Sequence, residues 1–148
     1  MFVALTAGRA FWVWLGESPF GVAGATYVDF FQQLDRRIAI PIAVIGTLGP
    51  VLAGASAALC RSNRRTFLCL LAACGLGVAS ALVTVLVNVP INEEIASWNP
   101  GALPVGYEEV LRRWWSWHIV RLVTSVGAMC AVFLALLARG EASGARAA

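Results

Sequence analysis

Three groups of polar residues lie within otherwise apolar segments of this 148-residue chain. The first has four-residue spacing and consists of Thr84, Asn88 and Asn92, with Pro90 between the two asparagines. The second recurs at three- and four-residue spacing along the last apolar segment: Trp114, Trp117, His118, Arg121, Thr124 and Ser125. The third is the pair Arg9 and Glu17, about two helical turns apart. On helices, each group would form one stripe.

Each group alone has a structural explanation. Asparagines hydrogen-bond neighbouring helices in membranes, a long arginine side chain reaches back toward the interface, and a lone histidine is most often a structural residue. Together, however, the three stripes are expected to end at the same side of the protein. Because polar groups inside a membrane are costly, this convergence predicts a small-molecule site between helices.

The composition identifies the surroundings of these groups. Only 13% of the residues are charged and 59% are hydrophobic, which a small soluble domain could not bury. Charge-free runs at 38–60 and 66–91 are long enough to cross a bilayer unaided, and 118–138 crosses it if Arg121 is included. The segment 2–24 is the weakest candidate, because it carries Arg9 and Glu17.

No barrel-like alternation is present, so the sequence predicts an all-α integral membrane four-helix bundle. We expect one domain over residues 1–139, with helices at about 2–24, 38–60, 66–91 and 118–138. The small polar residues at 140–148 are expected to form a disordered tail.

The charges predict the orientation. All eleven basic residues are arginines, and the short connection between the second and third predicted helices holds three of them, Arg61, Arg64 and Arg65, without an acid. Short basic connections stay on the cytoplasmic side. We therefore expect both termini in the cytoplasm, in the plasma (inner) membrane, and the connections 17–37 and 93–117 on the outside.

Tryptophans collect near the predicted outer ends. They make the 93–117 connection a Trp-rich, partly helical extracytoplasmic loop in our prediction. Amphipathic rings prefer the headgroup level, so a belt is the ordinary interpretation. All six on one side exceeds a symmetric belt and indicates that some line a pocket. The candidate substrate-binding residues are Trp98, Trp114, Trp117 and Gln32.

Several classes of protein are excluded or disfavoured. A formal charge of only +3, without a basic stripe, excludes a nucleic-acid binder. The four cysteines form no CxxC motif, which disfavours a redox pair. One histidine cannot alone furnish a metal centre, so we expect neither metal nor cofactor. The expected partners are membrane lipid and a small hydrophobic or aromatic ligand, and the chain could also form oligomers.

The chain resembles the anthrone-oxygenase-like family of small four-helix membrane proteins. The resemblance rests on Asn88-Val-Pro-Ile-Asn92, on Trp98-Asn-Pro100 and on Trp114-Trp-Ser-Trp-His118-Ile-Val-Arg121, with weaker similarity in the rest of residues 5–137. Ser18 and Phe31 stand where many relatives carry histidine. His118 is therefore the only imidazole, which argues against a histidine-based metal centre.

The resemblance implies oxidation of an anthrone to an anthraquinone by O2 without an evident cofactor. Such a reaction needs a base, and His118 would serve because an imidazole titrates near neutral pH, with Glu17 as the alternative in a desolvated setting. The developing negative charge would be stabilised by Arg121, Asn88 and Asn92. The tryptophans would stack against a flat substrate.

Two other functions stay open. The protein could be a non-catalytic membrane binding or assembly subunit, in which the tryptophan-rich loop docks a partner and the asparagines join helices. It could also be a four-helix membrane enzyme similar to the glutathione transferases of the eicosanoid type, although a single arginine near His118 offers little for an anionic thiol cofactor.

Overall fold

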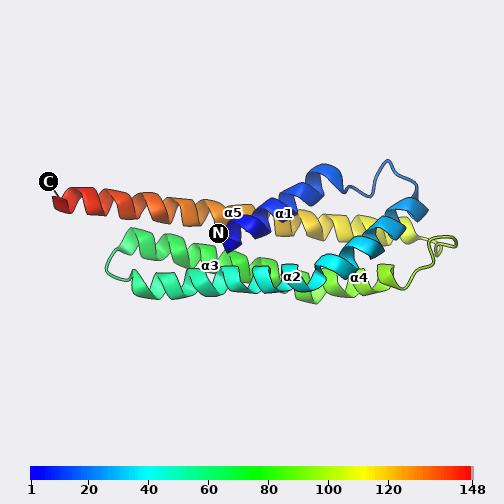
Figure 1. Ribbon diagram of the computed structural model, residues 1–148, viewed down its shortest axis with the longest axis horizontal. Helices are drawn as coiled ribbons and strands as arrows, with labels where there is room; N and C mark the ends of the chain where they lie inside the picture. Colours follow the sequence, from blue (N-terminus) through cyan, green and yellow to red (C-terminus); the bar gives the residue numbers. More distant parts are fainter. Residues whose placement is uncertain (148) are drawn as a thin grey trace.

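The computed structural model describes the backbone of residues 1–147 and the side chains of residues 1–140. Its helices are α1 (Phe2–Gly16), α2 (Gly24–Leu59), α3 (Arg64–Val83), the π-helix η1 (Thr84–Asn88), α4 (Val89–Ala96) and α5 (Tyr107–Ala147). Because α3, η1 and α4 follow one another without a break, they form one rod. Long rods lie side by side, and the shorter α1 crosses α5 at an angle (Figure 1).

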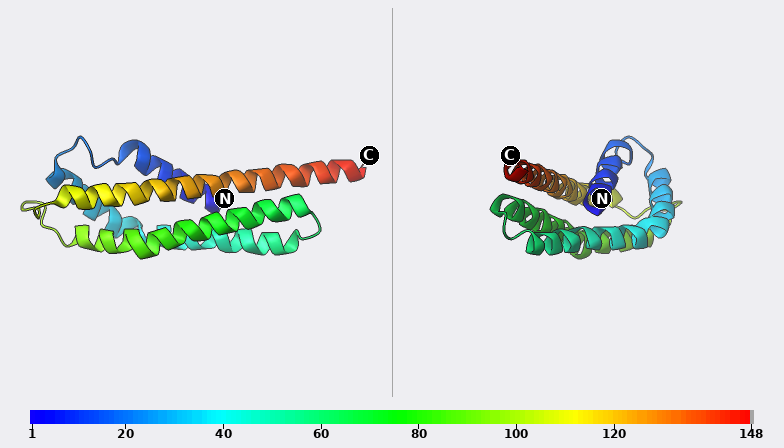
Figure 2. Two further views of the ribbon diagram at one scale, coloured as in Figure 1. Left: turned by 180° about the vertical axis from the view of Figure 1, so that it is seen from behind. Right: turned by 60° about the vertical axis from the view of Figure 1, so that its left-hand side comes forward.

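The prediction of an all-α protein is confirmed. The 147 residues whose backbone is described contain four helical rods and no strand beyond one isolated bridge between Asn99 and Ala102. Seen from behind and from the side, α2 and the α3–α4 rod pack together, while α5 lies against α3 and crosses α1 (Figure 2).

Four helices were predicted to cross the membrane, and the described helices differ in whether their length and apolar composition are sufficient for this. Within the described chain, three rods are long and apolar enough to cross a membrane: Gly24–Leu59, Arg64–Ala96 and Tyr107–Gly140. The fourth, α1, has 15 residues, which span about 22 Å against a hydrocarbon core of about 30 Å. The chain after Gly16 does not continue as helix, so the predicted segment 2–24 ends early.

The other helices extend beyond the predicted runs. The α2 helix starts at Gly24 instead of 38, and α5 starts at Tyr107 instead of 118, so that only 97–106 of the predicted outer loop is not helical. The reason is that a charge-free run marks what lipid can cover, whereas a helix continues wherever its charged side chains reach water. Exposed ion pairs such as Arg112–Glu109 lie in these extensions.

The segment predicted to be a disordered tail, 140–148, falls almost wholly on residues whose side chains lie outside the described part of the chain. The α5 backbone is helical to Ala147. Residue 148 itself is not described.

The turn between α2 and α3 is stabilised by a local hydrogen bond. The Oδ1 atom of Asn63 accepts a hydrogen bond from the backbone N–H of Thr66 at 3.2 Å, which caps the start of α3. Gly77 of α3 lies where α3 packs against α2, and a Cβ added to it would come within 3.0 Å of Pro50. The small residue therefore lets α2 and α3 approach closely.

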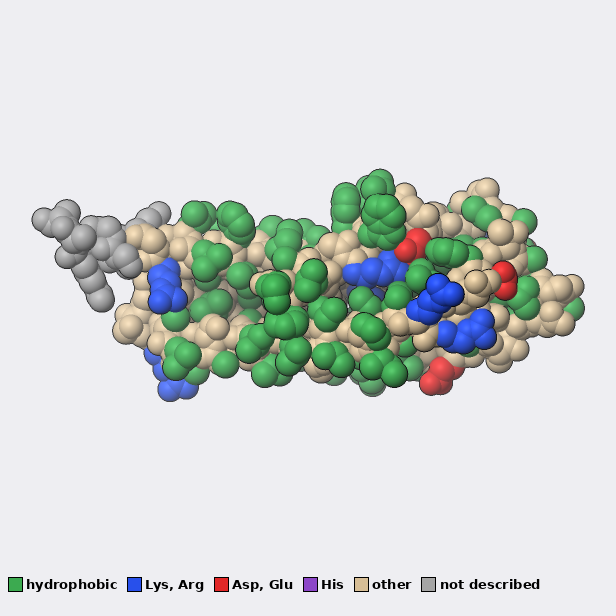
Figure 3. Space-filling view, in the orientation of Figure 1, with side chains coloured by type: hydrophobic (Ala, Val, Ile, Leu, Met, Phe, Trp, Pro, Cys, Tyr) green, Lys and Arg blue, Asp and Glu red, His purple; other side chains and the backbone are tan. Residues whose placement is uncertain are grey.

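The apolar side chains divide between a core and an outer surface. A cluster of buried side chains lies at the end where α1, α2, α4 and α5 meet: Val13, Tyr27, Val28, Phe31, Ile91, Ile95, Leu111 and Trp114. A smaller alanine cluster, Ala53, Ala73 and Ala131, packs the other half. Exposed hydrophobic side chains cover the middle of the molecule (Figure 3). Such a surface suits contact with lipid rather than water.

Candidate functional site

The single histidine lies beside the larger core, against its member Trp114. His118 is 1% exposed, and its Nε2 atom lies 3.0 Å from the backbone oxygen of Ala10 on α1. The imidazole stacks on Trp114, with ring centroids 5.4 Å apart and planes 12° apart, and on Trp115, at 5.8 Å and 28°. Helices α1 and α5 therefore hold the ring in one orientation, with the two indoles on one side of it and their own centroids 6.4 Å apart.

The contact with Ala10 assigns the proton of the neutral imidazole. A backbone carbonyl only accepts hydrogen bonds, so the Nε2 atom of His118 must donate. In the neutral ring the other nitrogen, Nδ1, then carries the lone pair. A base at this position would act through Nδ1.

Asn92 joins three helices on the far side of Trp114. Its Nδ2 atom donates to Oδ1 of Asp35 on α2 at 2.9 Å, and its Oδ1 atom accepts from Nε1 of Trp114 at 2.7 Å. Phe31 packs edge-on against the same indole, with centroids 5.4 Å apart. Both polar ends of the Asn92 amide are thus used to hold the Trp114 ring that stacks on His118.

The polar stripes of α5 and of the α3–α4 rod face each other. These helices run in opposite directions (Figure 1), and two contacts fix their register: Ser80 Oγ lies 3.1 Å from Ser125 Oγ, and Asn92 bonds Trp114. Between these contacts, Asn88 falls level with His118. The π-helix η1 lies in the same interval. Between the two contacts the α3–α4 rod has one residue more than α5, and the wider turn of the π-helix accommodates it. Such π-bulges are frequent at functional sites.

Asn88 is the clearest anomaly of the site. Its side chain is fully buried, and neither its Nδ2 nor its Oδ1 atom has a hydrogen-bond partner among the described residues. Leaving a buried amide unpaired costs about 1–3 kcal/mol. Such a group in a native core calls for an explanation, and a ligand that it is placed to bind is one.

Two arginines lie beside this centre. Arg9 on α1 makes a bidentate ion pair with Glu17, with N–O distances of 2.9 and 3.0 Å, and the two side chains are 23% and 14% exposed. Arg121 is half-buried one turn after His118. Glu17 is therefore committed to Arg9 and is not the free carboxyl that the alternative base requires.

The other candidate residues have separate places. The Nε2 atom of Gln32 donates to the backbone oxygens of Ile95 and Trp98, at 3.0 and 2.9 Å, and so ties α2 to the end of α4. The half-buried Trp98 ring packs against the larger core. Trp117 is 38% exposed on the outer face of α5, away from that core.

Sequence reasoning missed Asp35, Trp115 and Phe31 as neighbours of the site. The signal was present in α2, where Tyr27, Phe31 and Asp35 recur every four residues and would share a face of any helix that started near Gly24. Because the second helix was predicted to start at 38, these three residues were not expected to lie on a helix. Trp115 is one of the six tryptophans of the predicted belt, and its place beside Trp114 in the sequence did not distinguish it from the others.

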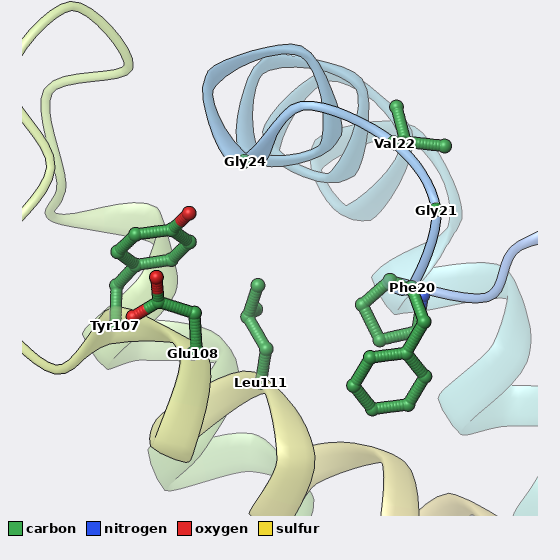
Figure 4. Close-up of a pocket in the computed structure, with 8 residues that line it drawn as sticks. Phe20, Gly21, Val22, Gly24, Tyr107, Glu108 and Leu111 are labelled. Carbon is green, nitrogen blue, oxygen red and sulfur yellow. The ribbon is translucent and has the colours of Figure 1, made fainter.

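A small cavity opens next to this core. It has a volume of about 180 Å³ and is lined by Pro19, Phe20, Gly21, Val22, Gly24, Tyr107, Glu108 and Leu111. Tyr107, Glu108 and Leu111 project from the start of α5, and Phe20 comes from the α1–α2 connection (Figure 4). Phe20 also packs edge-on against Trp115, with centroids 6.3 Å apart, so one ring separates the cavity from the indole that stacks on His118.

Within the described residues, no three histidine, cysteine, aspartate or glutamate side chains come together as a metal site. The functional groups carried by this part of α1, α5 and the α3–α4 rod are one imidazole, one unpaired amide, two guanidinium groups and two indoles. This set can move a proton and stabilise an oxyanion in a low-dielectric interior.

Comparison with known proteins agrees with the resemblance of the motifs. The family model described as anthrone oxygenase matches residues 31–144, which is more than three quarters of the chain. The match includes α5 and the α3–α4 rod, and it begins within α2, so that α1 lies outside it. No curated protein and no solved structure matches the chain.

Proposed function

The chain belongs to the anthrone oxygenase family, and from this premise we propose that it is a membrane oxygenase that oxidises a flat aromatic carbon acid with O2, without a cofactor. The observation that carries the proposal is the unpaired amide of Asn88 at the level of His118. A buried donor without a partner costs stability, and it gains a role if it binds the oxygen on which negative charge develops.

His118 is the base in this proposal. Its Nδ1 atom takes one proton from the CH2 group of the substrate, which leaves a carbanion delocalised as an enolate onto the ring carbonyl. The N–H of Asn88 and the charge of Arg121 stabilise that enolate oxygen. Support for this assignment comes from the Nε2 contact with Ala10, which leaves Nδ1 as the basic nitrogen.

The remaining steps need no further redox group. The carbanion passes one electron to O2, and the carbon radical and superoxide combine to a peroxide anion bound to that carbon, which the imidazolium of His118 protonates to the hydroperoxide. Removal of the second C–H proton then breaks the O–O bond, and the departing hydroxide takes up a proton as water. The sum is anthrone plus O2 giving anthraquinone plus water.

The substrate would approach through the cavity beside Phe20. Its volume is below the roughly 300–1,000 Å³ of ordinary ligand pockets. Phe20 and Trp115 must therefore move aside before a tricyclic ring reaches His118. The α1–α2 connection that carries Phe20 contains Gly21 at φ +87°, a conformation that favours glycine.

We also propose that the site faces the extracytoplasmic side of the plasma membrane, with both termini in the cytoplasm. The α2–α3 turn is short and carries Arg61 and Arg64 without an acid, whereas Arg112 and Arg113 at the other end are paired with Glu109 and Glu94. The positive-inside rule favours this orientation.

The test uses purified protein in neutral detergent with anthrone as substrate. We expect O2 consumption well above the spontaneous rate, one anthraquinone per O2, and no accumulation of hydrogen peroxide. An unaccelerated rate with a folded protein would overturn the proposal. It would favour the binding or assembly subunit, for which the contacts of Gln32 and Asn92 between helices are the supporting observation.

A further inference from the structure

Two arginines and one glutamate lie where α1 and α5 pack together, so one positive charge among the described residues there has no acidic partner. Glu17 is held by both terminal nitrogens of Arg9. Among the described residues, no acid and no hydrogen-bond acceptor is paired with the guanidinium of Arg121. The neighbouring imidazole adds no compensating negative charge. Two guanidinium groups and only one carboxylate therefore lie in an apolar setting among the described residues, where an uncompensated charge is costly.

The geometry places the two arginines on the same side of the helix crossing. Nε2 of His118 touches the oxygen of Ala10, which fixes these positions opposite each other. Arg9 precedes Ala10, Arg121 follows His118 by one turn, and α1 and α5 run in opposite directions (Figure 1). A basic patch with an acidic group beside it is visible where α1 crosses α5, surrounded by hydrophobic side chains (Figure 3).

We propose that Arg9 and Arg121 form a binding site for the oxyanion of a small aromatic ligand, with Glu17 as the counter-ion that this oxyanion replaces on Arg9. Guanidinium groups bind carboxylates and phenolates through paired N–H donors. The indoles of Trp114 and Trp115 lie one to two turns away on α5, with centroids 6.4 Å apart and planes tilted by 34°, and they suit the aromatic body of such a ligand. The proposal rests on the proposed function for the placement of that body.

The depth of the site favours a small ligand over a lipid headgroup. Arg113 pairs with Glu94 at the exposed end of α5, and both side chains are well exposed. Arg121 lies eight residues further along the helix, or about 12 Å deeper. A phosphate at the level of Arg113 would not reach it, whereas an aromatic acid that enters the core would.

The experiment compares two probes of the same shape by calorimetric titration of the purified protein in neutral detergent. The probes are naphthalene-2-carboxylate and the uncharged 2-naphthalenemethanol. We expect the carboxylate to bind at least tenfold more tightly. Arg121→Gln should weaken carboxylate binding at least tenfold and change alcohol binding less than twofold. The matched control, Arg113→Gln, removes an arginine of the same helix and should leave both affinities unchanged.

A second variant tests the role of Glu17. Glu17→Gln removes the competing carboxylate and should tighten naphthalene-2-carboxylate binding several-fold. Thermal unfolding of each variant in the same detergent reports whether it is folded. Equal affinities for the two probes, or equal effects of Arg121→Gln and Arg113→Gln, would overturn the site. So would loss of carboxylate binding in nanodiscs of phosphatidylglycerol relative to phosphatidylcholine, because an anionic lipid would then be the occupant.

Failure of this inference and failure of the proposed function are distinguishable. Binding is measured without turnover, and O2 consumption is measured separately. Charge-selective binding without oxidation would support the oxyanion site and overturn the proposed oxygenase function. Oxidation without charge-selective binding would support the oxygenase function and overturn the oxyanion site.

Discussion

Replacing Asn88 with leucine is expected to stabilise the protein and to slow its turnover at least tenfold. The side chain is fully buried and both of its polar atoms lack partners in the described chain. Leucine has a similar shape and removes the cost of the unpaired amide, so the free energy of unfolding should rise by about 1–3 kcal/mol. The lost donor would leave the enolate oxygen less stabilised.

Asn92 supplies the matched control for this prediction. It lies on the same stripe one turn away, but its amide bonds both Asp35 and Trp114. Asn92→Leu should therefore lower the free energy of unfolding by about 1–3 kcal/mol. Thermal or denaturant unfolding in detergent, together with O2 uptake, measures both variants. If Asn88→Leu were destabilising and fully active, Asn88 would be structural and the proposed site would lose its oxyanion donor.

Replacing His118 with glutamine is expected to reduce the rate of oxidation by about 10²- to 10⁴-fold, the usual contribution of a general base. The fold should persist, because the glutamine amide can donate to the oxygen of Ala10 as Nε2 of His118 does. Activity should therefore fall while the unfolding temperature changes little. The measurement is initial O2 uptake with anthrone, corrected for spontaneous oxidation.

Ser116→Ala is the control for His118→Gln. Ser116 is exposed on the same helix, two residues away, and its hydroxyl bonds only the backbone oxygen of Arg112 in the described structure. This variant should keep full activity. Comparable rates for His118→Gln and Ser116→Ala would show that another group removes the proton.

The sequence was sufficient for those parts of the protein that depend on spacing within one helix. The stripe of Asn88 and Asn92, and that of Trp114, His118 and Arg121, follow from three- and four-residue recurrence. The family followed from the same residues, and the match over 31–144 confirms it. The all-α class followed from the length of the apolar runs.

Contacts between helices could not be predicted in the same way. The bond between Asp35 and Asn92 depends on α2 starting at Gly24, well inside the charged segment. The unpaired state of Asn88 depends on the register set by the π-helix, which no apolar pattern reveals. The ion pair of Arg9 with Glu17 required α1 to end at Gly16, so that Glu17 could turn back.

The lengths of the helices illustrate the limit of hydropathy. A charge-free run measures lipid contact, and it underestimated α2 and α5, whose charged ends stay helical. It overestimated α1, where the run contains Gly16 and Pro19 and the helix stops at 15 residues. Three helices rather than four are therefore long enough to cross the membrane in the described chain.

The central claim is that His118 and Asn88 together remove a proton from an aromatic CH2 group. The most direct test is hydrogen exchange without oxygen: anthrone is incubated with the protein in D2O under anaerobic conditions, and deuterium at the CH2 carbon is measured by mass spectrometry. The account predicts incorporation faster than the protein-free rate for the wild type, and an acceleration at least tenfold smaller for His118→Gln and for Asn88→Leu. Equal acceleration by wild type and both variants would contradict it.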